Sequence, residues 1–322
     1  MKQIYLCDDK KILNNVYSFV DNKEGSIFSK KELIESGMKD VEVIFSTWGM
    51  PVFTEEEVKN YLPNLKMIFY AAGTVKFFAT PFLNRGVRIF SAWKANAVPV
   101  AEYAIAQIIL ANKGFYQMPK LIKEDYNMAR SFSQKYTGNY KAKVGIIGYG
   151  SISSLVVEGL KNNNVDIFVY SSHMSKEFAD SIGVKLATMD EIFSTCDVIS
   201  NHMANTEKTV GAINKNLLSK MKDYSTFINT GRGAQVDENA LVEVMKNNKT
   251  LTAVLDVTFP EPPVKDSPLY SCDNIILTPH IAGSSGKEVC RMAQYMLQEK
   301  DRIDNGEKPL YEVTRDMLET MA

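Results

Sequence analysis

The sequence contains little that would hold a metal ion or a disulfide framework. Its 322 residues include four cysteines and three histidines. Cys7, Cys196, Cys272 and Cys290 form no CxxC pair, and the histidines are widely separated along the chain. We therefore expect free, buried thiols and predict neither disulfide bonds nor a metal site.

The sequence also lacks an excess of charge and a long apolar run. Lysine plus arginine total 37 and aspartate plus glutamate 38, so the formal net charge is −1. This balance argues against a general binder of nucleic acids or membranes, because no basic excess is available to neutralise phosphates. The longest apolar-rich stretch, Val98–Leu110, contains Glu102 and Gln107 and falls short of the ~18 apolar residues of a membrane span. The apolar run Ile4–Cys7 is too short for a signal peptide, so we expect a cytoplasmic protein.

Short apolar runs alternate with polar stretches of helical length along the whole chain. Runs that are apolar on both faces and separated by helices are typical of parallel sheets covered on either side, so the predicted class is α/β. At ~100–200 residues per domain, the length suggests two domains. The predicted strands are Gln3–Cys7, Val41–Ser46, Lys66–Tyr70, Val87–Phe90, Lys143–Ile147, Val165–Tyr170, Asp197–Ser200, Thr226–Asn229, Ala253–Val257 and Asn274–Leu277.

One long helical segment separates the two series of strands. Pro99 stands where a helix can begin, and Val100–Leu110 continues with helical apolar spacing until Pro119 interrupts it. We expect this segment to link two domains. The last periodic stretch, Val289–Ile303, is expected to be a helix that returns to the first domain.

A glycine-rich loop directly follows the predicted strand Lys143–Ile147. The run Gly148–Ser153 is a GxGxxG pattern with serine in the third position, and a helix-like stretch follows. Such a loop places the pyrophosphate of a dinucleotide on the helix N-terminus, while an empty glycine turn and a methyltransferase loop remain alternatives. The residues expected to bind the cofactor here are Gly148, Tyr149, Gly150, Ser151 and Ile152.

The next strand ends without the acidic residue that recognises the ribose 2′-hydroxyl of NAD. Ser171, Ser172 and His173 stand there instead, and the first carboxylate is Glu177. Hydroxyls and basic groups can bind a 2′-phosphate, so we expect NADP or NAD to be accepted, with NADP slightly preferred. A solvated turn that discriminates poorly is the alternative.

Three charged residues each follow a predicted strand in the second half of the chain. Arg232 lies in the run Phe227–Gly233, Glu261 in a proline-rich loop and His280 in Leu277–Gly283. Ligands gather outside the carboxyl ends of parallel strands, so the three are expected to meet in one crevice. An arginine fork can hold a carboxylate and polarise a neighbouring ketone, while a histidine can donate a proton to that ketone and a glutamate can orient the imidazolium.

In order and spacing, these patterns resemble the D-isomer-specific 2-hydroxyacid dehydrogenase family, including phosphoglycerate dehydrogenases and glyoxylate/hydroxypyruvate reductases. The resemblance extends from about Val41 to Gly283 and includes the matches Asn96–Glu102, Gly148–Ser153, Asn229–Gly233, Val236–Glu238, Asp256–Pro262 and Thr278–Gly283. It implies a Rossmann-type doubly wound parallel sheet domain, 101–289, inserted into a smaller flavodoxin-like α/β substrate domain, 1–100 and 290–322. It further implies hydride transfer between NAD(P)H and a small 2-oxo or 2-hydroxy acid, and a homodimer.

The same resemblance assigns further residues. His202, Thr230 and Asp256 are expected to line the cofactor, with a purely structural role open for His202. The loop Tyr70–Val75 resembles the family loop whose backbone holds the substrate carboxylate, which assigns Ala72, Gly73 and Thr74 to substrate binding. Family members often carry Asp-Asn after this loop, whereas this chain has Val75 and Lys76, so the role of Lys76 stays open. Trp48 and Trp93 either shape the side-chain pocket or belong to the core.

Two other functions compete with the 2-oxo acid reductase. A dinucleotide-sensing binding protein, similar to the corepressors that resemble this family, would keep the fold and cofactor without turnover. A family member acting on formate or phosphite fits less well, because such donors have no ketone oxygen for His280 to protonate. The sequence decides neither the acid, nor the physiological direction of the reaction.

Overall fold

The computed structural model describes residues 1–21, 23 and 26–320. The chain divides into two compact units, Met1–Asn96 with Ser284–Ala322, and Ala97–Gly283. These boundaries lie four and six residues earlier than the predicted ones after residues 100 and 289. The first differs because helix α5 (Trp93–Ala111) begins before Pro99, which lies inside it, so the chain crosses between the units within a continuous helix.

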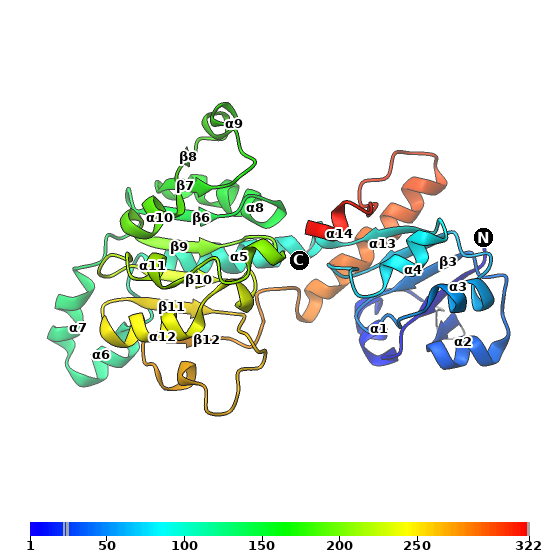
Figure 1. Ribbon diagram of the computed structural model, residues 1–322, viewed down its shortest axis with the longest axis horizontal. Helices are drawn as coiled ribbons and strands as arrows, with labels where there is room; N and C mark the ends of the chain where they lie inside the picture. The colour runs from blue at the N-terminus through cyan, green and yellow to red at the C-terminus, as the bar shows by residue number, and fades with distance from the viewer. Residues whose placement is uncertain (22, 24–25, 321–322) are drawn as a thin grey trace. The chain divides into compact units, whose positions relative to one another are not determined.

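The unit Ala97–Gly283 contains a seven-stranded parallel sheet with the order β12-β11-β10-β9-β6-β7-β8 (Figure 1). The chain enters the sheet at the interior strand β6, continues outward to β8, and then returns to the other side of β6 with β9. This reversal is the switch point at which doubly wound sheets bind ligands. The strands are β6 (Lys143–Ile147), β7 (Asp166–Tyr170), β8 (Lys185–Leu186), β9 (Val198–Asn201), β10 (Thr226–Asn229), β11 (Thr252–Leu255) and β12 (Ile275–Leu277).

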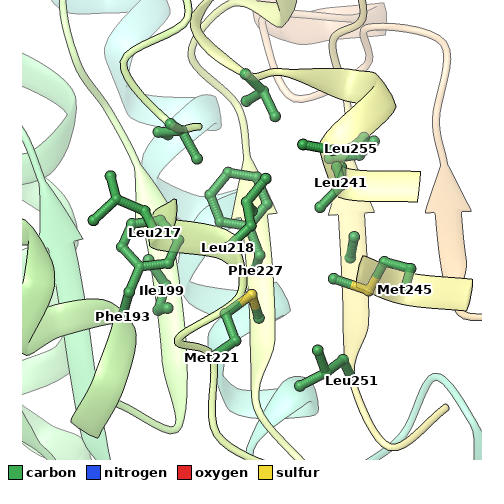
Figure 2. Close-up of a cluster of buried hydrophobic side chains, with 14 of the residues drawn as sticks. Phe193, Ile199, Leu217, Leu218, Met221, Phe227, Leu241, Met245, Leu251 and Leu255 are labelled. Carbon is green, nitrogen blue, oxygen red and sulfur yellow. The ribbon is translucent and has the colours of Figure 1, made fainter. Parts of the chain in front are cut away.

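Helices cover both faces of this sheet, as the apolar runs predict. One face buries Ile199, Phe227 and Leu255 against α10, α11 and α12, and Figure 2 shows this cluster. The opposite face packs Val198 and Ile228 against α5, α8 and α9. The helices of this unit, besides most of α5, are α6 (Met118–Glu124), α7 (Tyr126–Ser133), α8 (Ser151–Leu160), α9 (Lys176–Ser181), α10 (Met189–Thr195), α11 (Lys215–Leu218) and α12 (Glu238–Asn247).

The other unit contains a five-stranded parallel sheet with the order β2-β1-β3-β4-β5. Tyr5, Phe45, Phe69 and Phe90 occupy paired positions on successive strands, and neighbouring rings stack with centroids 4.8 to 5.5 Å apart. Helices α1 and α13 cover this aromatic face, and α2, α3 and α4 the opposite one. The elements are β1 (Gln3–Leu6), β2 (Ile27–Phe28), β3 (Val43–Ser46), β4 (Met67–Tyr70), β5 (Arg88–Ser91), α1 (Lys10–Val16), α2 (Lys30–Ser36), α3 (Glu55–Tyr61), α4 (Ala79–Asn84), α13 (Val289–Asp304) and α14 (Met317–Thr320).

Several details differ from the sequence-based expectations. The two-residue strands β2 and β8 were missed, and Pro119 stands in the first turn of a separate helix, α6, rather than interrupting a long one. The cysteines are free, but Cys290 is only partly buried. The last helix does belong to the first unit, as expected. Among the described residues, no helix is both long and apolar enough to span a membrane.

Candidate active site

The three charged residues that the sequence singles out all follow strands of the seven-stranded sheet. Arg232 follows β10, Glu261 lies in the loop after β11, and His280 follows β12. These strands are adjacent and parallel, so the three loops leave the same edge of the sheet. All three residues therefore lie in one compact unit, on neighbouring loops at one end of its sheet.

His280 and Glu261 form a direct pair. The Nδ1 atom of His280 lies 2.7 Å from Oε1 of Glu261, and the two side chains are 47% and 41% exposed. His280 has a left-handed backbone conformation with φ of 54°, which is uncommon for a residue with a side chain. Because Nδ1 is engaged by the glutamate, Nε2 is the ring nitrogen left to face a ligand.

Asp256, which directly follows β11, holds the His280 loop in this conformation. Its carboxylate accepts hydrogen bonds from the Thr278 hydroxyl at 2.6 Å and from the backbone N–H groups of Ile281 and Ala282 at 2.8 and 2.9 Å. Its backbone carbonyl accepts a further bond from the His280 N–H at 3.0 Å. Asp256 is only 2% exposed, so these contacts give it a positioning role. A contact with the cofactor stays a prediction.

A network of buried amide side chains fixes the backbone around Arg232. The Asn201 amide donates to Asn229 and Gln235, at 3.0 and 2.8 Å. Gln235 in turn accepts from the Arg232 N–H at 3.1 Å, while Asn229 accepts from the Gly231 N–H at 3.0 Å. Asn201 and Gln235 could not be identified as site residues from the sequence, because only their tertiary contacts connect them to Arg232.

The Arg232 guanidinium is tied to the backbone of its own loop. Its Nη1 donates to the Gly231 carbonyl at 2.7 Å. Burial lowers the pKa of Arg232 below its ordinary value, and the negative charge of Glu261 partly opposes this shift. The guanidinium therefore lacks part of its normal hydration, which favours an anionic ligand at this position.

Gly233 brings the Arg232 loop against the loop that carries Glu261. A Cβ atom at this position would lie 2.0 Å from the carbonyl carbon of Thr258 and 2.5 Å from the amide nitrogen of Phe259. The glutamate-bearing loop is also tied to α12, because the Phe259 N–H donates to Glu238 at 2.7 Å. Burial raises the pKa of Glu238, and this hydrogen bond counteracts the rise.

The glycine-rich loop connects β6 to α8, as the sequence predicts. Gly148 has φ of 88°, and a Cβ there would lie 2.8 Å from the His202 carbonyl oxygen. Gly150 is exposed, and a Cβ there would meet no protein atom within 4 Å, which leaves room for a ligand at the α8 N-terminus. Ser153, in the third glycine position, accepts the Gly150 N–H at 2.7 Å and so closes the turn.

Two buried polar atoms that follow the neighbouring strands β9 and β10 have no hydrogen-bond partner among the described residues. They are Nδ1 of His202, which follows β9, and Oγ1 of Thr230, which follows β10. Burial lowers the pKa of His202 to about 4, so the ring is neutral at neutral pH. Unpartnered buried polar atoms are costly, so their presence here fits a site that receives a polar ligand such as a dinucleotide.

The turn after β7 and the loop after β4 are the remaining predicted site segments. Ser171 accepts the His173 N–H at 3.3 Å, and both Ser172 and His173 are exposed. In the other unit, the Ala72 N–H donates to the Tyr70 carbonyl at 2.9 Å, so this group is already engaged. A contact of the Gly73 and Thr74 N–H groups with the substrate stays a prediction.

Comparison with known proteins identifies the family. Residues 105–282 match the profile described as "D-isomer specific 2-hydroxyacid dehydrogenase, NAD binding domain", which is more than half of the chain. The chain belongs to this dehydrogenase family.

Curated relatives of this family member include two kinds of enzyme. D-3-phosphoglycerate dehydrogenase of Archaeoglobus fulgidus is 36% identical over 234 residues, which cover 72% of this chain and 44% of that protein. Glyoxylate reductase of Korarchaeum cryptofilum is 27% identical over 293 residues, which cover 90% of this chain and 87% of that protein. The chain thus spans about half the length of the phosphoglycerate dehydrogenases that it matches.

Solved structures of family members share the fold. The holo form of Rhodotorula graminis D-mandelate dehydrogenase has a TM-score of 0.79 at 19% identity and covers 98% of both chains. The NAD-complexed D-isomer specific 2-hydroxyacid dehydrogenase of Lactobacillus delbrueckii ssp. bulgaricus has a TM-score of 0.77 at 19% identity, covering 97% of this chain and all of that one. At such identities the likeness shows the fold alone.

Proposed function

We propose that the protein is an NAD(P)H-dependent reductase that converts a small 2-oxo acid into the D-2-hydroxy acid. The observation that carries this proposal is the pairing of His280 with Glu261 at 2.7 Å on loops adjacent to that of Arg232. The loops that carry a proton donor, its orienting carboxylate and a cation lie at the carboxyl ends of the parallel strands, as does the glycine-rich loop. Reduction of a ketone beside a carboxylate needs these groups together with a hydride donor.

Arg232 is the proposed substrate anchor. Its guanidinium presents a rigid fork of charged donors, which suits a carboxylate and the neighbouring ketone oxygen of a 2-oxo acid. The bond to the Gly231 carbonyl limits its freedom, and partial desolvation strengthens its attraction for an anion. Negative charge develops on the ketone oxygen during reduction, so the same cation stabilises the transition state.

His280 is the proposed general acid. With Nδ1 engaged by Glu261, Nε2 donates its proton to the ketone oxygen in reduction and takes it back in oxidation. Glu261 orients the ring and stabilises the imidazolium form from which the proton leaves. His280 and Glu261 are both about half exposed, so the spent base regains its proton from solvent.

The proposed cofactor residues lie along the ends of β6, β7, β9 and β10. A bound nicotinamide dinucleotide supplies the hydride. Gly148, Gly150 and the α8 N-terminus hold its pyrophosphate, and His202 and Thr230 supply polar atoms that no described residue partners. The absence of a carboxylate among Ser171–His173 supports acceptance of NADP, with a slight preference over NAD.

The substrate itself is proposed only as a class. Relatives are named for glyoxylate and for 3-phosphoglycerate, and these acids differ in size and charge. The loop around Gly73 and Thr74 is the proposed second anchor of the substrate carboxylate. A homodimer is proposed from the family resemblance, and light scattering of the purified protein tests it.

The test is oxidation of NADPH and NADH by the purified protein, in parallel, with glyoxylate, hydroxypyruvate, pyruvate, 2-oxoisocaproate and phenylpyruvate. Turnover with any of them supports the reductase, ranks the substrates by side chain and compares the two cofactors. Equal or better affinity for NADH than for NADPH contradicts the slight preference for NADP. Tight dinucleotide binding without turnover across the panel contradicts the proposed reductase and favours the dinucleotide-sensing alternative.

A further inference from the structure

Ser200 and His202 form a hydrogen-bonded pair beside the glycine-rich loop. The Ser200 hydroxyl lies in β9, is fully buried, and is 2.9 Å from Nε2 of His202. The His202 N–H donates to the carbonyl of Ile147, the last residue of β6, at 2.8 Å. The backbone of His202 also touches Gly148 so closely that a Cβ there has no room. The histidine is therefore a fixed neighbour of the first glycine in the loop.

The proton of the Ser200 hydroxyl determines which ring nitrogen carries hydrogen. Among the described residues, this hydroxyl has His202 as its hydrogen-bond partner and no carbonyl or carboxylate acceptor. It must therefore donate to Nε2, because a buried hydroxyl proton without an acceptor is costly. Nε2 then carries a lone pair. Because burial keeps the ring neutral, its single proton resides on Nδ1.

This assignment makes Nδ1 a buried donor that has no acceptor in the described part of the chain. Its neighbour Gly148 begins the loop where a dinucleotide pyrophosphate rests on a helix N-terminus. The central part of a dinucleotide, its pyrophosphate and the adjoining ribose, offers acceptor oxygens and few donors.

We propose that Ser200 fixes His202 in the Nδ1–H tautomer, and that this N–H donates to an oxygen in the pyrophosphate–ribose part of the bound dinucleotide. Ser200 is then a positioning residue that acts through His202 without touching the cofactor. The donor role rests on the proposed function, whereas the tautomer is a property of the protein alone.

The tautomer is measured first, by two-dimensional NMR that correlates ring protons with the two ring nitrogens. The chain has three histidines, and loss of signals in His202→Asn assigns those of His202. In the wild type we expect a protonated Nδ1 and an unprotonated Nε2 at neutral pH. Ser200→Ala removes the donor to Nε2 and shifts the signals toward the other tautomer, whereas Ser200→Thr retains the hydroxyl and the wild-type pattern.

Binding is measured by titration with NADH, ADP-ribose and ADP. Loss of one neutral hydrogen bond weakens binding about two- to twelvefold, and we expect this loss for NADH in Ser200→Ala and His202→Gln. His202→Asn places an amide donor near the position of Nδ1 and retains most of the affinity. An effect that extends to ADP assigns the acceptor to the diphosphate or the adenosine ribose, while one limited to NADH and ADP-ribose assigns it to the second ribose.

Ser225→Ala is the matched control. Ser225 is equally buried and directly precedes β10 at the opposite edge of the same sheet, where its hydroxyl donates to the Lys222 carbonyl at 2.7 Å. This variant reports the general cost of deleting a buried hydroxyl, and we expect unchanged dinucleotide affinity.

Three results overturn the inference or part of it. An Nε2–H tautomer in the wild type contradicts the role of Ser200, and unchanged NADH affinity in Ser200→Ala and His202→Gln contradicts the donor role. A wild-type protein that binds none of the three nucleotides overturns the proposed function together with the donor role, while the tautomer result stands separately.

Discussion

The contact made by Gly233 leads to a quantitative prediction for Gly233→Ala. The added Cβ would lie 2.0 Å from the Thr258 carbonyl carbon, and ordinary contacts begin at 3.4 Å, so the two loops must separate by about 1.4 Å. The three atoms nearest to the added methyl group all belong to the backbone of Thr258 and Phe259, which cannot rotate away as a flexible side chain can. The substitution therefore moves Arg232 away from the loop of Glu261.

The expected loss is large in turnover and moderate in stability. A misplacement of about 1 Å costs on the order of 100-fold in rate, so we expect kcat/KM to fall by roughly that factor. Overpacking costs about 1–3 kcal/mol in the free energy of unfolding. Steady-state kinetics with the best 2-oxo acid and urea unfolding measure the two quantities on the same preparation.

Gly37→Ala is the control for stability alone. Gly37 ends α2 in the other unit with φ of 65°, and a Cβ there meets nothing within 4 Å. Alanine in this left-handed conformation costs about 1–2 kcal/mol without displacing the site, so we expect normal kcat/KM. The reasoning is refuted if folded Gly233→Ala retains kcat/KM within about threefold, or if Gly37→Ala loses as much turnover.

Four further outcomes follow from the site. His280→Ala removes the proton donor and should lower kcat by at least about 100-fold with dinucleotide affinity retained, as stopped-flow and binding titrations measure; near-normal turnover would refute the assignment. Arg232→Lys keeps the charge but loses the fork, so both KM and kcat should worsen, and a change in neither would exclude Arg232 as the anchor. Glu261→Gln should lower kcat, because the His280 ring loses the carboxylate that lies 2.7 Å from its Nδ1 and orients it; an unchanged kcat would contradict this role. Burial lowers the pKa of His202 to about 4 from 6.5, so the stability contributed by the neutral ring is complete above pH 6.5 and is lost by at most about 3 kcal/mol as pH falls toward 4. Urea unfolding at pH 7 and pH 5 should therefore show a smaller pH effect in His202→Asn than in the wild type.

Much of the fold was accessible from the sequence because its signals are local. Strands buried on both faces are short apolar runs, and the capping boxes at Thr54 and Thr188 join residues only three positions apart. The strands β2 and β8 were missed, since two residues carry too little pattern to distinguish a strand from a loop. The start of α5 was misplaced because a proline is typical of a helix start but is also tolerated within this helix.

In the candidate site, too, the residues with local sequence signals could be predicted and those defined by tertiary contacts could not. Arg232, Glu261 and His280 could be proposed from the sequence because each follows an apolar run at the carboxyl end of a strand. The residues that support the Arg232 loop could not be predicted. Gln235 accepts the Arg232 N–H across a turn, and Asn201 at the end of the neighbouring strand β9 donates to Gln235. Such contacts depend on which strands become neighbours, which no short window of sequence specifies.

The division of the chain into two units has a practical consequence for spectroscopy. The chain has two tryptophans, Trp48 and Trp93, and both lie in the unit Met1–Asn96 with Ser284–Ala322. Emission excited selectively from tryptophan therefore reports the unfolding of that unit, while circular dichroism records the helices of both. Coincident denaturation curves from the two signals would mean that the units melt as one cooperative system. Separated curves would give each unit its own free energy of unfolding without any engineered label.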